Sequence, residues 1–267
     1  MKIWKNTATL DSYTQVTADT VEPELAEIAV LGSRPFDHRA MPNLKGVFKC
    51  GVGLDNLPIE ELKERNIALG LPSNETRRYI YEETANYAVY LILCLLYREV
   101  GDLAKWTKAP RVFLGNRTVL VVGAGNIGSS VSEKLKPMCR VLTYDVAHHH
   151  PDVLREALPQ ADVVTLHIPS IPETKGFVGT DFLAQMKDGA GLVNTARGAI
   201  VDEDALYGEI KQGRLCAAFD VFWEEPYKGK LAEFHPDLFW MSPHVASANE
   251  TFLQGLAKDF EDFIQKF

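Results

Sequence analysis

The stretch Thr118-Val-Leu-Val-Val-Gly-Ala-Gly-Asn-Ile-Gly128 decides the fold of this chain. Its apolar first half predicts a buried strand, and the glycines that follow open a helix that we expect to run through Lys136. In this spacing Gly123 permits a tight turn, Gly125 lets the backbone approach a pyrophosphate, and Gly128 allows the helix to pack closely on the sheet. Free N–H groups at the start of the helix favour phosphates. The stretch therefore predicts a dinucleotide site.

The next expected strand, Arg140–Asp145, ends in a carboxylate that bears on the choice of dinucleotide. Asp145 can accept hydrogen bonds from a ribose diol, and its charge would repel a 2'-phosphate. Val146 and Ala147 follow it, rather than Arg or Lys. We therefore expect NAD as the cofactor. The alternative is that the glycines only shape a turn and that Asp145 caps a helix.

Three consecutive histidines, His148, His149 and His150, come directly after this segment. Adjacent imidazoles suggest a metal site, but no carboxylate or thiolate cluster accompanies them in the sequence. We expect an exposed loop beside the adenosine site and no bound metal.

The second half of the chain alternates apolar strands with helices. Strands are expected at Asp162–His167, Gly191–Asn194 and Cys216–Asp220, and helices at Thr180–Met186 and Glu203–Gln212. Continuous apolar strands separated by helices are typical of a parallel sheet covered on both faces. The expected fold class is α/β, with a doubly wound, Rossmann-type sheet.

The residues before Tyr81 show the same rhythm in shorter pieces. Ala29–Gly32 and Gly46–Cys50 are expected strands, and Pro58–Arg65 is an expected helix. From Tyr81 to Arg98 apolar residues fill most of a helix circumference, which predicts a helix buried on several sides that runs between two domains. The sequence thus predicts a second, smaller α/β domain.

Composition narrows the class of function. The 267-residue chain has a formal net charge of -8, whereas a nucleic-acid surface needs a clustered excess of Lys and Arg. Neither a signal peptide nor a membrane span is expected, because the longest apolar run, Tyr87–Tyr97, is too short. Four cysteines without a C-x-x-C pair indicate reduced thiols in a cytoplasmic protein. Small-molecule chemistry is the remaining expectation.

Six ordered motifs run through the chain: Gly51–Asn56 (GVGLDN), Val122–Gly128 (VGAGNIG), Leu166–Pro169 (LHIP), Asn194–Gly198 (NTARG), Asp220–Pro226 (DVFWEEP) and Ser242–Ala246 (SPHVA). With these motifs the chain resembles the D-isomer-specific 2-hydroxyacid dehydrogenases, from about Asn43 to Ser247. The resemblance implies hydride transfer between NAD(H) and a small 2-hydroxy or 2-oxo acid. It also implies a flavodoxin-like substrate domain over residues 1–76 and 246–267, and a dinucleotide-binding domain over residues 77–245.

The resemblance implies a catalytic set of Arg197, Glu225 and His244. Arg197 would bind the substrate carboxylate and carbonyl, for which a planar guanidinium at a strand end is suited. The alternative is a surface arginine paired with an acid. His244 would transfer the proton, and the Glu225 carboxylate would favour its imidazolium form. Glu224 is the less suitable partner because the spacing from Asp220 favours Glu225.

By the same resemblance, two further sets of residues bind the cofactor and the substrate. Asp220 is expected near the nicotinamide carboxamide. N–H groups around Val52 and Gly53 would hold the substrate carboxylate, unless the glycines only make a strand-to-helix turn. Lys49 would meet a second anionic group of the substrate or, alternatively, is a solvated lysine at a strand end. The cofactor set is Gly123, Gly125, Asn126, Ile127, Gly128, Asp145, His167, Pro169, Thr174, Thr195, Ala196 and Asp220, and the substrate set is Lys49, Gly51, Val52, Gly53, Asn74 and Arg197.

The chain is shorter than typical members of that family in three places. A strand-helix unit is missing between Asn6 and Glu27, the connector between Trp106 and Asn116 is abbreviated, and a last strand is lacking at Phe267. In the family the connector contributes to a dimer interface. We expect a homodimer, and the shortened connector leaves its construction open.

Two other functions remain open at this stage. The same fold supports oxidation of formate or phosphite, and some relatives act as NAD-sensing scaffolds. The complete set of Arg197, Glu225 and His244 argues against the scaffold. The expected partner is a small 2-oxo or 2-hydroxy acid, with no nucleic acid and no membrane.

Overall fold

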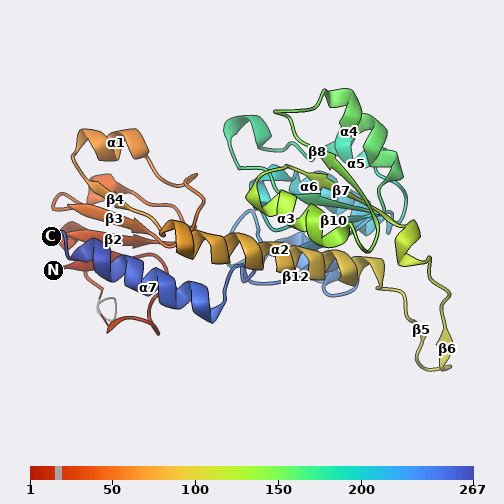
Figure 1. Cartoon of the computed structure of the whole chain (residues 1–267), viewed down its shortest axis with the longest axis horizontal. Helices are drawn as coiled ribbons and strands as arrows, with labels where there is room; N and C mark the ends of the chain where they lie inside the picture. Colours follow the sequence, from red (N-terminus) through yellow and green to blue (C-terminus); the bar gives the residue numbers. More distant parts are fainter. Residues whose placement is uncertain (16–19) are drawn as a thin grey trace. The chain divides into compact units, whose positions relative to one another are not determined.

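The computed structural model describes residues 1–15 and 20–267 of the chain. These residues form two compact units: Met1–Ile80 with Ser247–Phe267 make up the smaller, and Tyr81–Ala246 the larger. The chain passes from the first to the second inside helix α2 (Asn74–Leu96) and returns after Ala246 (Figure 1).

A six-stranded parallel sheet forms the centre of the larger unit, in the order β12-β11-β10-β9-β7-β8. Because β7 lies between β8 and β9, the chain winds first to one side of β7 and then to the other. Ligands bind at the carboxyl ends of strands where such a reversal occurs. The doubly wound fold is therefore confirmed. The strands are β7 (Thr118–Val122), β8 (Arg140–Tyr144), β9 (Val163–Leu166), β10 (Gly191–Asn194), β11 (Cys216–Phe219) and β12 (Phe239–Met241).

Helices cover both faces of this sheet. Side chains of β7 alternate between the faces. Val119 and Val121 pack with α2 and α3, whereas Leu120 and Val122 pack with α4, α5 and α6. All four are fully buried, and each such burial is worth about 1.5–3 kcal/mol. The covering helices are α2, α3 (Asn126–Leu135), α4 (Pro151–Ala157), α5 (Thr180–Gln185) and α6 (Glu203–Lys211).

The smaller unit has four parallel strands in the order β1-β2-β3-β4. On one face Phe48 of β3 packs against Phe260 of α7, with ring centroids 5.2 Å apart. On the other face Val47 packs with Leu62 of α1. Asn249 caps α7 by accepting the N–H of Phe252. The elements are β1 (Ile3–Lys5), β2 (Ile28–Leu31), β3 (Gly46–Lys49), β4 (Ala68–Gly70), α1 (Ile59–Glu64) and α7 (Glu250–Ile264).

One strand of a flavodoxin-like sheet has no counterpart among the described residues of the smaller unit. The flavodoxin order 2-1-3-4-5 places an edge strand outside the first strand, whereas β1 is itself the edge here. Residues 6–15 and 20–27 contain no strand, and residues 16–19 lie outside the described residues. The difference falls in the segment where the sequence predicts a missing strand-helix unit.

Several boundaries differ from those expected. The long helix α2 begins before Tyr81. Between Tyr81 and Leu96 it exposes a single stripe, Glu82, Asn86 and Tyr90, so its expected burial on several sides is confirmed. Neither α2 nor any other helix of the described ranges is long and apolar enough to cross a membrane. The expected strands Arg140–Asp145, Asp162–His167 and Cys216–Asp220 each end one residue earlier, and the second also begins one residue later, at Val163. The sequence analysis predicted none of the elements β1, β4, β12, α4 and α7.

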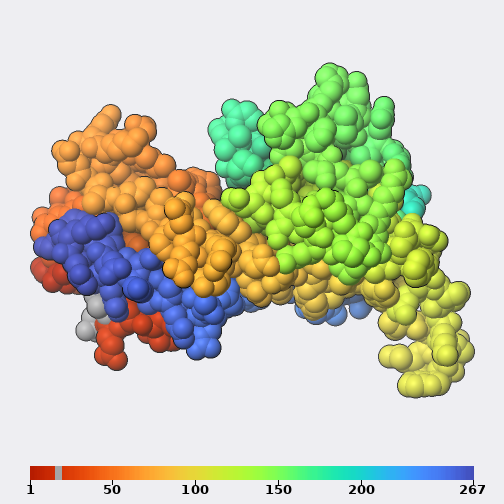
Figure 2. All heavy atoms as spheres, viewed as in Figure 1, coloured from red at the N-terminus to blue at the C-terminus, as the bar shows by residue number. Residues whose placement is uncertain are grey.

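A small antiparallel hairpin, β5 (Gly101–Asp102) and β6 (Thr107–Lys108), follows α2. It extends away from the six-stranded sheet, and Figure 2 shows it as a projection of the larger unit. Its tip exposes Leu103 and Trp106, which keep 72% and 85% of their accessible surface. A short two-stranded ribbon is at best marginally stable in water. The hairpin Gly101–Lys108, which we call the apolar arm, leads into the abbreviated connector.

Candidate active site

Three glycines at the junction of β7 and α3, two before the helix and one in its first turn, occupy three different environments. Gly123 has a φ of +103°, and a Cβ there would lie 2.5 Å from the carbonyl oxygen of His167. A Cβ on Gly128 would lie 1.9 Å from the carbonyl oxygen of Gly123. At Gly125, by contrast, an added Cβ would meet nothing within 4 Å. The turn is closed toward the sheet and open at Gly125, on the side where a pyrophosphate can approach.

Helix α3 begins without a side-chain cap. Its N-cap residue is Gly125, and both Gly125 and Asn126 are exposed, while Ile127 packs against the core. The first N–H groups of a helix carry partial positive charge and need acceptors from outside the helix. This helix start is suited to bind the phosphates of a dinucleotide.

Asp145 follows β8, and its carboxylate is tied to the glycine turn. Oδ2 accepts the N–H of Ala124 at 2.7 Å, and Oδ1 accepts that of Ala147 at 2.9 Å. These bonds hold the pKa of Asp145 below its usual value, and the nearby His148 and His149 lower it further. A fixed negative charge with lone pairs left for ribose hydroxyls stands beside the turn.

Other predicted cofactor residues lie after β9 and β10. The His167 ring lies 2.9 Å from Thr165 Oγ1, and burial lowers the pKa of His167 to about 3, so the ring is neutral. Thr174 donates to the Pro169 carbonyl at 2.6 Å and closes that loop. The Thr195 side chain is buried, and its hydroxyl has no hydrogen-bond partner among the described residues. Because buried hydroxyls are nearly always bonded, Thr195 suits a ligand contact.

The turn after β10 presents Arg197. Asn194 accepts the N–H of Ala196 at 2.9 Å and donates to the Arg197 carbonyl at 2.9 Å. A Cβ on Gly198 would lie 2.1 Å from the backbone carbon of Phe222, so this glycine lets the two segments meet. The Arg197 guanidinium donates to the Ala196 carbonyl at 2.7 Å. Its position is therefore set by neighbouring backbone.

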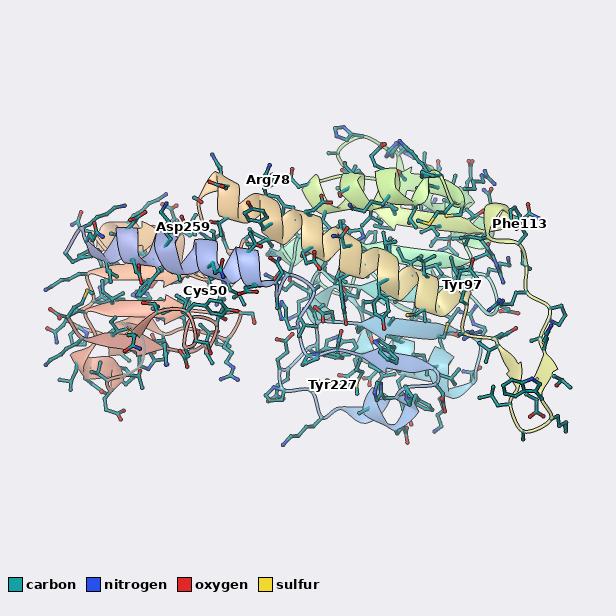
Figure 3. All side chains as sticks on the ribbon, turned by 60° about the horizontal axis from the view of Figure 1, so that its bottom comes forward. Cys50, Arg78, Tyr97, Phe113, Tyr227 and Asp259 are labelled. Carbon is teal, nitrogen blue, oxygen red and sulfur yellow. The ribbon has the colours of Figure 1, made fainter. Side chains whose placement is uncertain are left out.

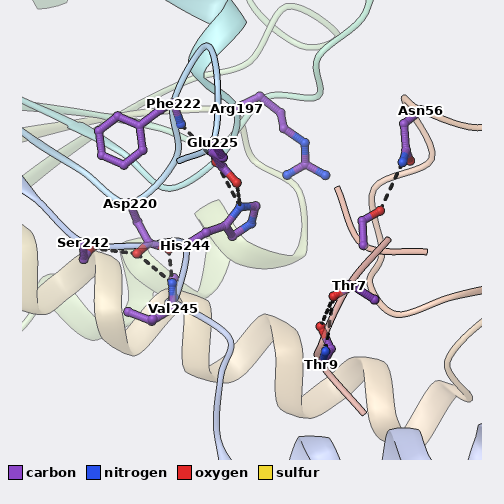
Figure 4. Close-up of polar contacts among 12 residues, drawn as sticks. Thr7, Thr9, Asn56, Arg197, Asp220, Phe222, Glu225, Ser242, His244 and Val245 are labelled. Atoms are coloured by element: carbon purple, nitrogen blue, oxygen red, sulfur yellow. Dashed lines mark hydrogen bonds and ion pairs between the residues drawn. The ribbon is translucent and has the colours of Figure 1, made fainter. Parts of the chain in front are cut away.

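Glu225 and His244 form a hydrogen-bonded pair across two strand ends. The imidazole Nδ1 of His244 lies 2.9 Å and 3.1 Å from the two carboxylate oxygens (Figure 4). Glu225 also accepts the N–H of Phe222 at 3.2 Å. Burial raises the pKa of Glu225, but its bonds to His244 and Phe222 and the charge of Arg197 outweigh burial and lower it overall. The neighbouring Glu224 is exposed.

The loop that carries His244 is fastened by Asp220, which is fully buried. Oδ1 accepts from Ser242 Oγ at 2.7 Å and from the Val245 N–H at 2.9 Å, and Oδ2 accepts the Ala246 N–H at 2.8 Å. Burial raises the pKa of Asp220, although these donors lower it in part. The carboxylate thus holds both sides of His244, and its predicted contact with a nicotinamide carboxamide stays a prediction.

His244 itself has a backbone conformation that few residues adopt. Its φ is +54°, in the left-handed region that costs a non-glycine residue about 1–2 kcal/mol. The bonds from Asp220 to Val245 and Ala246 maintain this conformation. Such strain persists only where the surroundings enforce it, and it is common at functional sites.

Three residues of this frame received no role in the sequence analysis: Asn194, Gly198 and Ser242. An Asn at a strand end that bonds nearby backbone is a recognisable turn signal. Gly198 and Ser242 act through segments distant in the sequence, so no local signal reveals them.

The predicted substrate residues outside this unit belong to the smaller unit. Lys49 is only 2% exposed and donates to the carbonyl of Gly32 and to Asn56 Oδ1, so the alternative of a solvated lysine is wrong. Asn74 is the first residue of α2 and accepts from Arg77 at 2.8 Å. Gly51 has no left-handed φ, and a Cβ there would meet nothing within 4 Å. Val52 and Gly53 are half-buried in the same segment.

The histidine run offers no metal site of the usual kind. Within residues 1–15 and 20–267, no three His, Cys, Asp or Glu side chains are grouped so that they could hold an ion. The four cysteines are unpaired.

Comparison with known proteins identifies the family. Residues 96–246 match the model of the D-isomer specific 2-hydroxyacid dehydrogenase NAD-binding domain. The glyoxylate reductase of Thermococcus litoralis is 30% identical over 93% of this chain and 78% of its own length. The glycerate dehydrogenase of Methylorubrum extorquens is 31% identical over 91% of this chain and 82% of its own length.

The fold agrees with this assignment. The D-lactate dehydrogenase of Aquifex aeolicus, solved with NAD and lactic acid, superimposes with a TM-score of 0.81 at 24% identity, covering 100% of this chain and 95% of its own. The family model covers most of the larger unit, where the glycine turn and the Glu225–His244 pair lie. The chain therefore belongs to the D-isomer-specific 2-hydroxyacid dehydrogenases, and it is an NAD-binding oxidoreductase.

Proposed function

We propose that the chain catalyses reversible hydride transfer between NAD(H) and a small 2-oxo or 2-hydroxy acid, with Arg197, Glu225 and His244 as its catalytic set. The observation that carries the proposal is the Glu225–His244 pair at 2.9 Å, next to the strand end that bears Arg197. A coupled carboxylate and imidazole beside an arginine form a proton donor and an anion-binding group in one place.

Arg197 binds the substrate carboxylate and polarises the keto oxygen. A guanidinium offers two parallel donors to a carboxylate and stays charged at every relevant pH. The turn built by Asn194 and Gly198 holds its backbone in place. The substrate is thereby oriented before the reaction begins.

His244 transfers the proton. In reduction, the imidazolium gives its proton to the oxygen of the former carbonyl while hydride adds to the carbon; in oxidation, the neutral ring takes the hydroxyl proton. Because the pKa of Glu225 is lowered, this carboxylate remains charged near neutral pH and stabilises the imidazolium. Glu225 also orients the ring through Nδ1, which leaves Nε2 for the substrate.

The larger unit would hold the dinucleotide, and the smaller unit would contribute to the substrate site. Bound NAD supplies the hydride acceptor, and NADH the donor. The open Gly125, the uncapped α3 and the buried hydroxyl of Thr195 fit a dinucleotide. Asp145 would bind the adenosine ribose. The remaining contacts fall to Gly123, Asn126, Ile127, Gly128, His167, Pro169, Thr174, Ala196 and Asp220 for the cofactor, and to Lys49, Gly51, Val52, Gly53 and Asn74 for the substrate.

The relatives point to acids of two or three carbons, because they are named for glyoxylate and glycerate. The test is NADH oxidation with glyoxylate, hydroxypyruvate, pyruvate and 3-phosphohydroxypyruvate, compared by kcat/KM. Arg197→Gln should lose activity on every acid while NADH binding persists. Absence of turnover on all four acids by a folded protein that binds NADH would contradict the proposed reaction.

The chain forms a homodimer through the apolar arm. Half of the large apolar side chains exposed in the described chain lie between Tyr90 and Phe113. Tyr97 directly follows the last residue of α2, and Phe113 lies where the chain returns from the hairpin (Figure 3). Exposed apolar side chains gathered in one segment indicate an interface. The other members of the cluster are Val100, Leu103, Trp106 and Val112.

Light scattering after size-exclusion chromatography tests this assembly. The parent should have the mass of two chains, and Leu103→Ser with Trp106→Ser should give a single chain with an unchanged fold. A parent of one-chain mass at micromolar concentration contradicts the dimer and leaves the proposed reaction unaffected.

A cytoplasmic location is proposed as well, because all four cysteines are unpaired. Cell fractionation tests this location.

A further inference from the structure

The run His148–His150 has no part in the function proposed above, yet it is folded against Asp145. The carbonyl oxygen of Asp145 accepts the backbone N–H of His148 at 3.0 Å and that of His149 at 2.9 Å. The chain therefore turns back immediately after β8. This turn brings two imidazoles beside the carboxylate that would bind the adenosine ribose.

The three histidines have different surroundings. His149 Nδ1 accepts the N–H of Asp145 at 3.0 Å, and its ring packs on Tyr144 with centroids 6.1 Å apart. His150 caps α4 and lies 3.0 Å from Asp152. The ring of His148 is exposed and makes no hydrogen bond or ion pair with the described residues. His150 is thus committed to α4, whereas His148 and His149 lie near enough to Asp145 to lower the pKa of its carboxyl.

Protonation of His148 and His149 changes the charges and the hydrogen-bond donors beside Asp145. A neutral His149 must carry its proton on Nε2, since Nδ1 is the acceptor for Asp145. An added proton on Nδ1 would face that same N–H, so the charged ring has to turn away and release it. His148 gains a positive charge with no acid bonded to it. With both histidines protonated, positive charges and an additional hydrogen-bond donor lie beside the carboxylate of Asp145.

Few other charges act at this place. From α4, Asp152 is paired with His150 and with Arg155, which lies 3.0 Å away. The charged residues of α3, Glu133 and Lys134, lie in its last turn, at the opposite end from the glycine turn. Imidazole is the side chain that changes charge between about pH 5 and 8. The imidazoles that neighbour the Asp145 carboxyl are those of His148 and His149.

We propose that His148 and His149 are specificity-determining residues for the adenosine end of the dinucleotide, and that their protonation relaxes the discrimination of Asp145 against a 2'-phosphate. The inference rests on the proposed function in one respect, the placement of the adenosine ribose at Asp145. Imidazolium groups attract and donate to a phosphate dianion. A ribose diol is uncharged and gains little. Affinity for NADPH relative to NADH therefore rises as pH falls.

The test is equilibrium binding of NADH and NADPH, followed by nucleotide fluorescence at constant ionic strength and without any acid substrate. Between about pH 8 and pH 6, the ratio of the NADPH Kd to the NADH Kd should fall about tenfold or more, as expected when a neutral neighbour becomes charged. His148→Gln with His149→Gln should keep the ratio high and nearly flat. The free 2'-phosphate also gains a proton near pH 6, but this affects parent and variant alike.

Two further variants sharpen the test. His150→Gln is the matched control and should retain the pH dependence of the parent, because that ring serves α4. His148→Arg should give a low ratio at every pH. A ratio that is flat in the parent, or equally steep in the double variant, overturns the proposal while NADH still binds. Failure of NADH to bind at any pH contradicts the proposed function itself.

Discussion

The proposed catalytic residues and the proposed nucleotide-binding residues lie along the same edge of one sheet, yet they differ in how their polar groups are satisfied. Around His244 the protein supplies its own partners: Glu225 bonds the ring, and Asp220 accepts from three donors in the loop. At the proposed nucleotide site, by contrast, two positions are left open by the protein. Gly125 faces open space, and the hydroxyl of Thr195 is unbonded among the described residues.

The difference indicates that one set of residues fixes the geometry of proton transfer, whereas the other set provides affinity for the ligand. Groups that must keep one arrangement during proton transfer are held by the protein, which avoids reorganisation at the moment of reaction. Groups that hold a ligand stay unsatisfied until it arrives. Substitutions at the first kind should therefore change rate or stability, and substitutions at the second kind should change binding.

The largest effect is expected for His244→Asn. Asparagine tolerates the left-handed backbone at this position, so the loop should keep its shape. Loss of the proton donor should lower kcat about 10²- to 10⁴-fold while the NADH Kd stays unchanged. Steady-state kinetics and fluorescence titration check the two quantities. A kcat close to that of the parent would remove His244 from the mechanism.

The pair Gly128→Ala and Gly125→Ala tests the nucleotide end. A methyl group on Gly128 would overlap the carbonyl of Gly123, so stability should fall by about 1–3 kcal/mol. The same change at Gly125 meets open space in the protein, so melting should be unaffected while NADH binding weakens about tenfold. Calorimetry and fluorescence titration distinguish them. Equal loss of stability in both variants would contradict the open position of Gly125.

Glu225→Gln should move the pH profile of reduction. Because its pKa lies below the usual 4.5, Glu225 is charged throughout the working range and favours the protonated acid. Without that charge the alkaline limb of kcat/KM should move about 1–3 pH units lower. Glu224→Gln, at the exposed neighbour, is the matched control and should leave the limb in place. A profile identical to that of the parent would show that Glu225 does not tune the acid.

The smallest effect is expected for Ser242→Ala. It removes one of the three donors to Asp220 and should lower stability by about 0.5–1.5 kcal/mol, with a minor change in kcat. Urea denaturation measures the difference. An unchanged midpoint would mean that the two backbone N–H groups suffice to hold the loop.

Sequence patterns predicted the parts of the molecule whose signals are local. The glycine spacing, the apolar strands of the larger unit and Asp145 are each contained within a short window, and the doubly wound sheet follows from them. The motifs also singled out Glu225 rather than Glu224 as the partner of His244. In the structure Glu225 and His244 are hydrogen-bonded.

What the sequence left out depends on contacts between distant segments. Gly198 is required by Phe222, and Ser242 by Asp220, and neither relation has a fixed spacing. Strands β1, β4 and β12 have only three residues each, too few for a clear alternation. For Lys49 the sequence left open whether the ammonium meets a second anionic group of the substrate or solvent, and its enclosure by two oxygen acceptors has no local sequence signal because lysines are seldom buried.

The chain crosses between its units at two positions, and the second crossing bears on how the substrate preference of such an enzyme can change. Arg197, Glu225 and His244 all precede Ser247, and Asp220 clamps the last residues before that crossing. With Lys49, Val52 and Gly53 at the substrate as proposed, the smaller unit can accumulate changes in which acid it accepts without altering the residues proposed to transfer the proton. New substrate preferences become accessible by altering one module while the chemistry is inherited intact from the other.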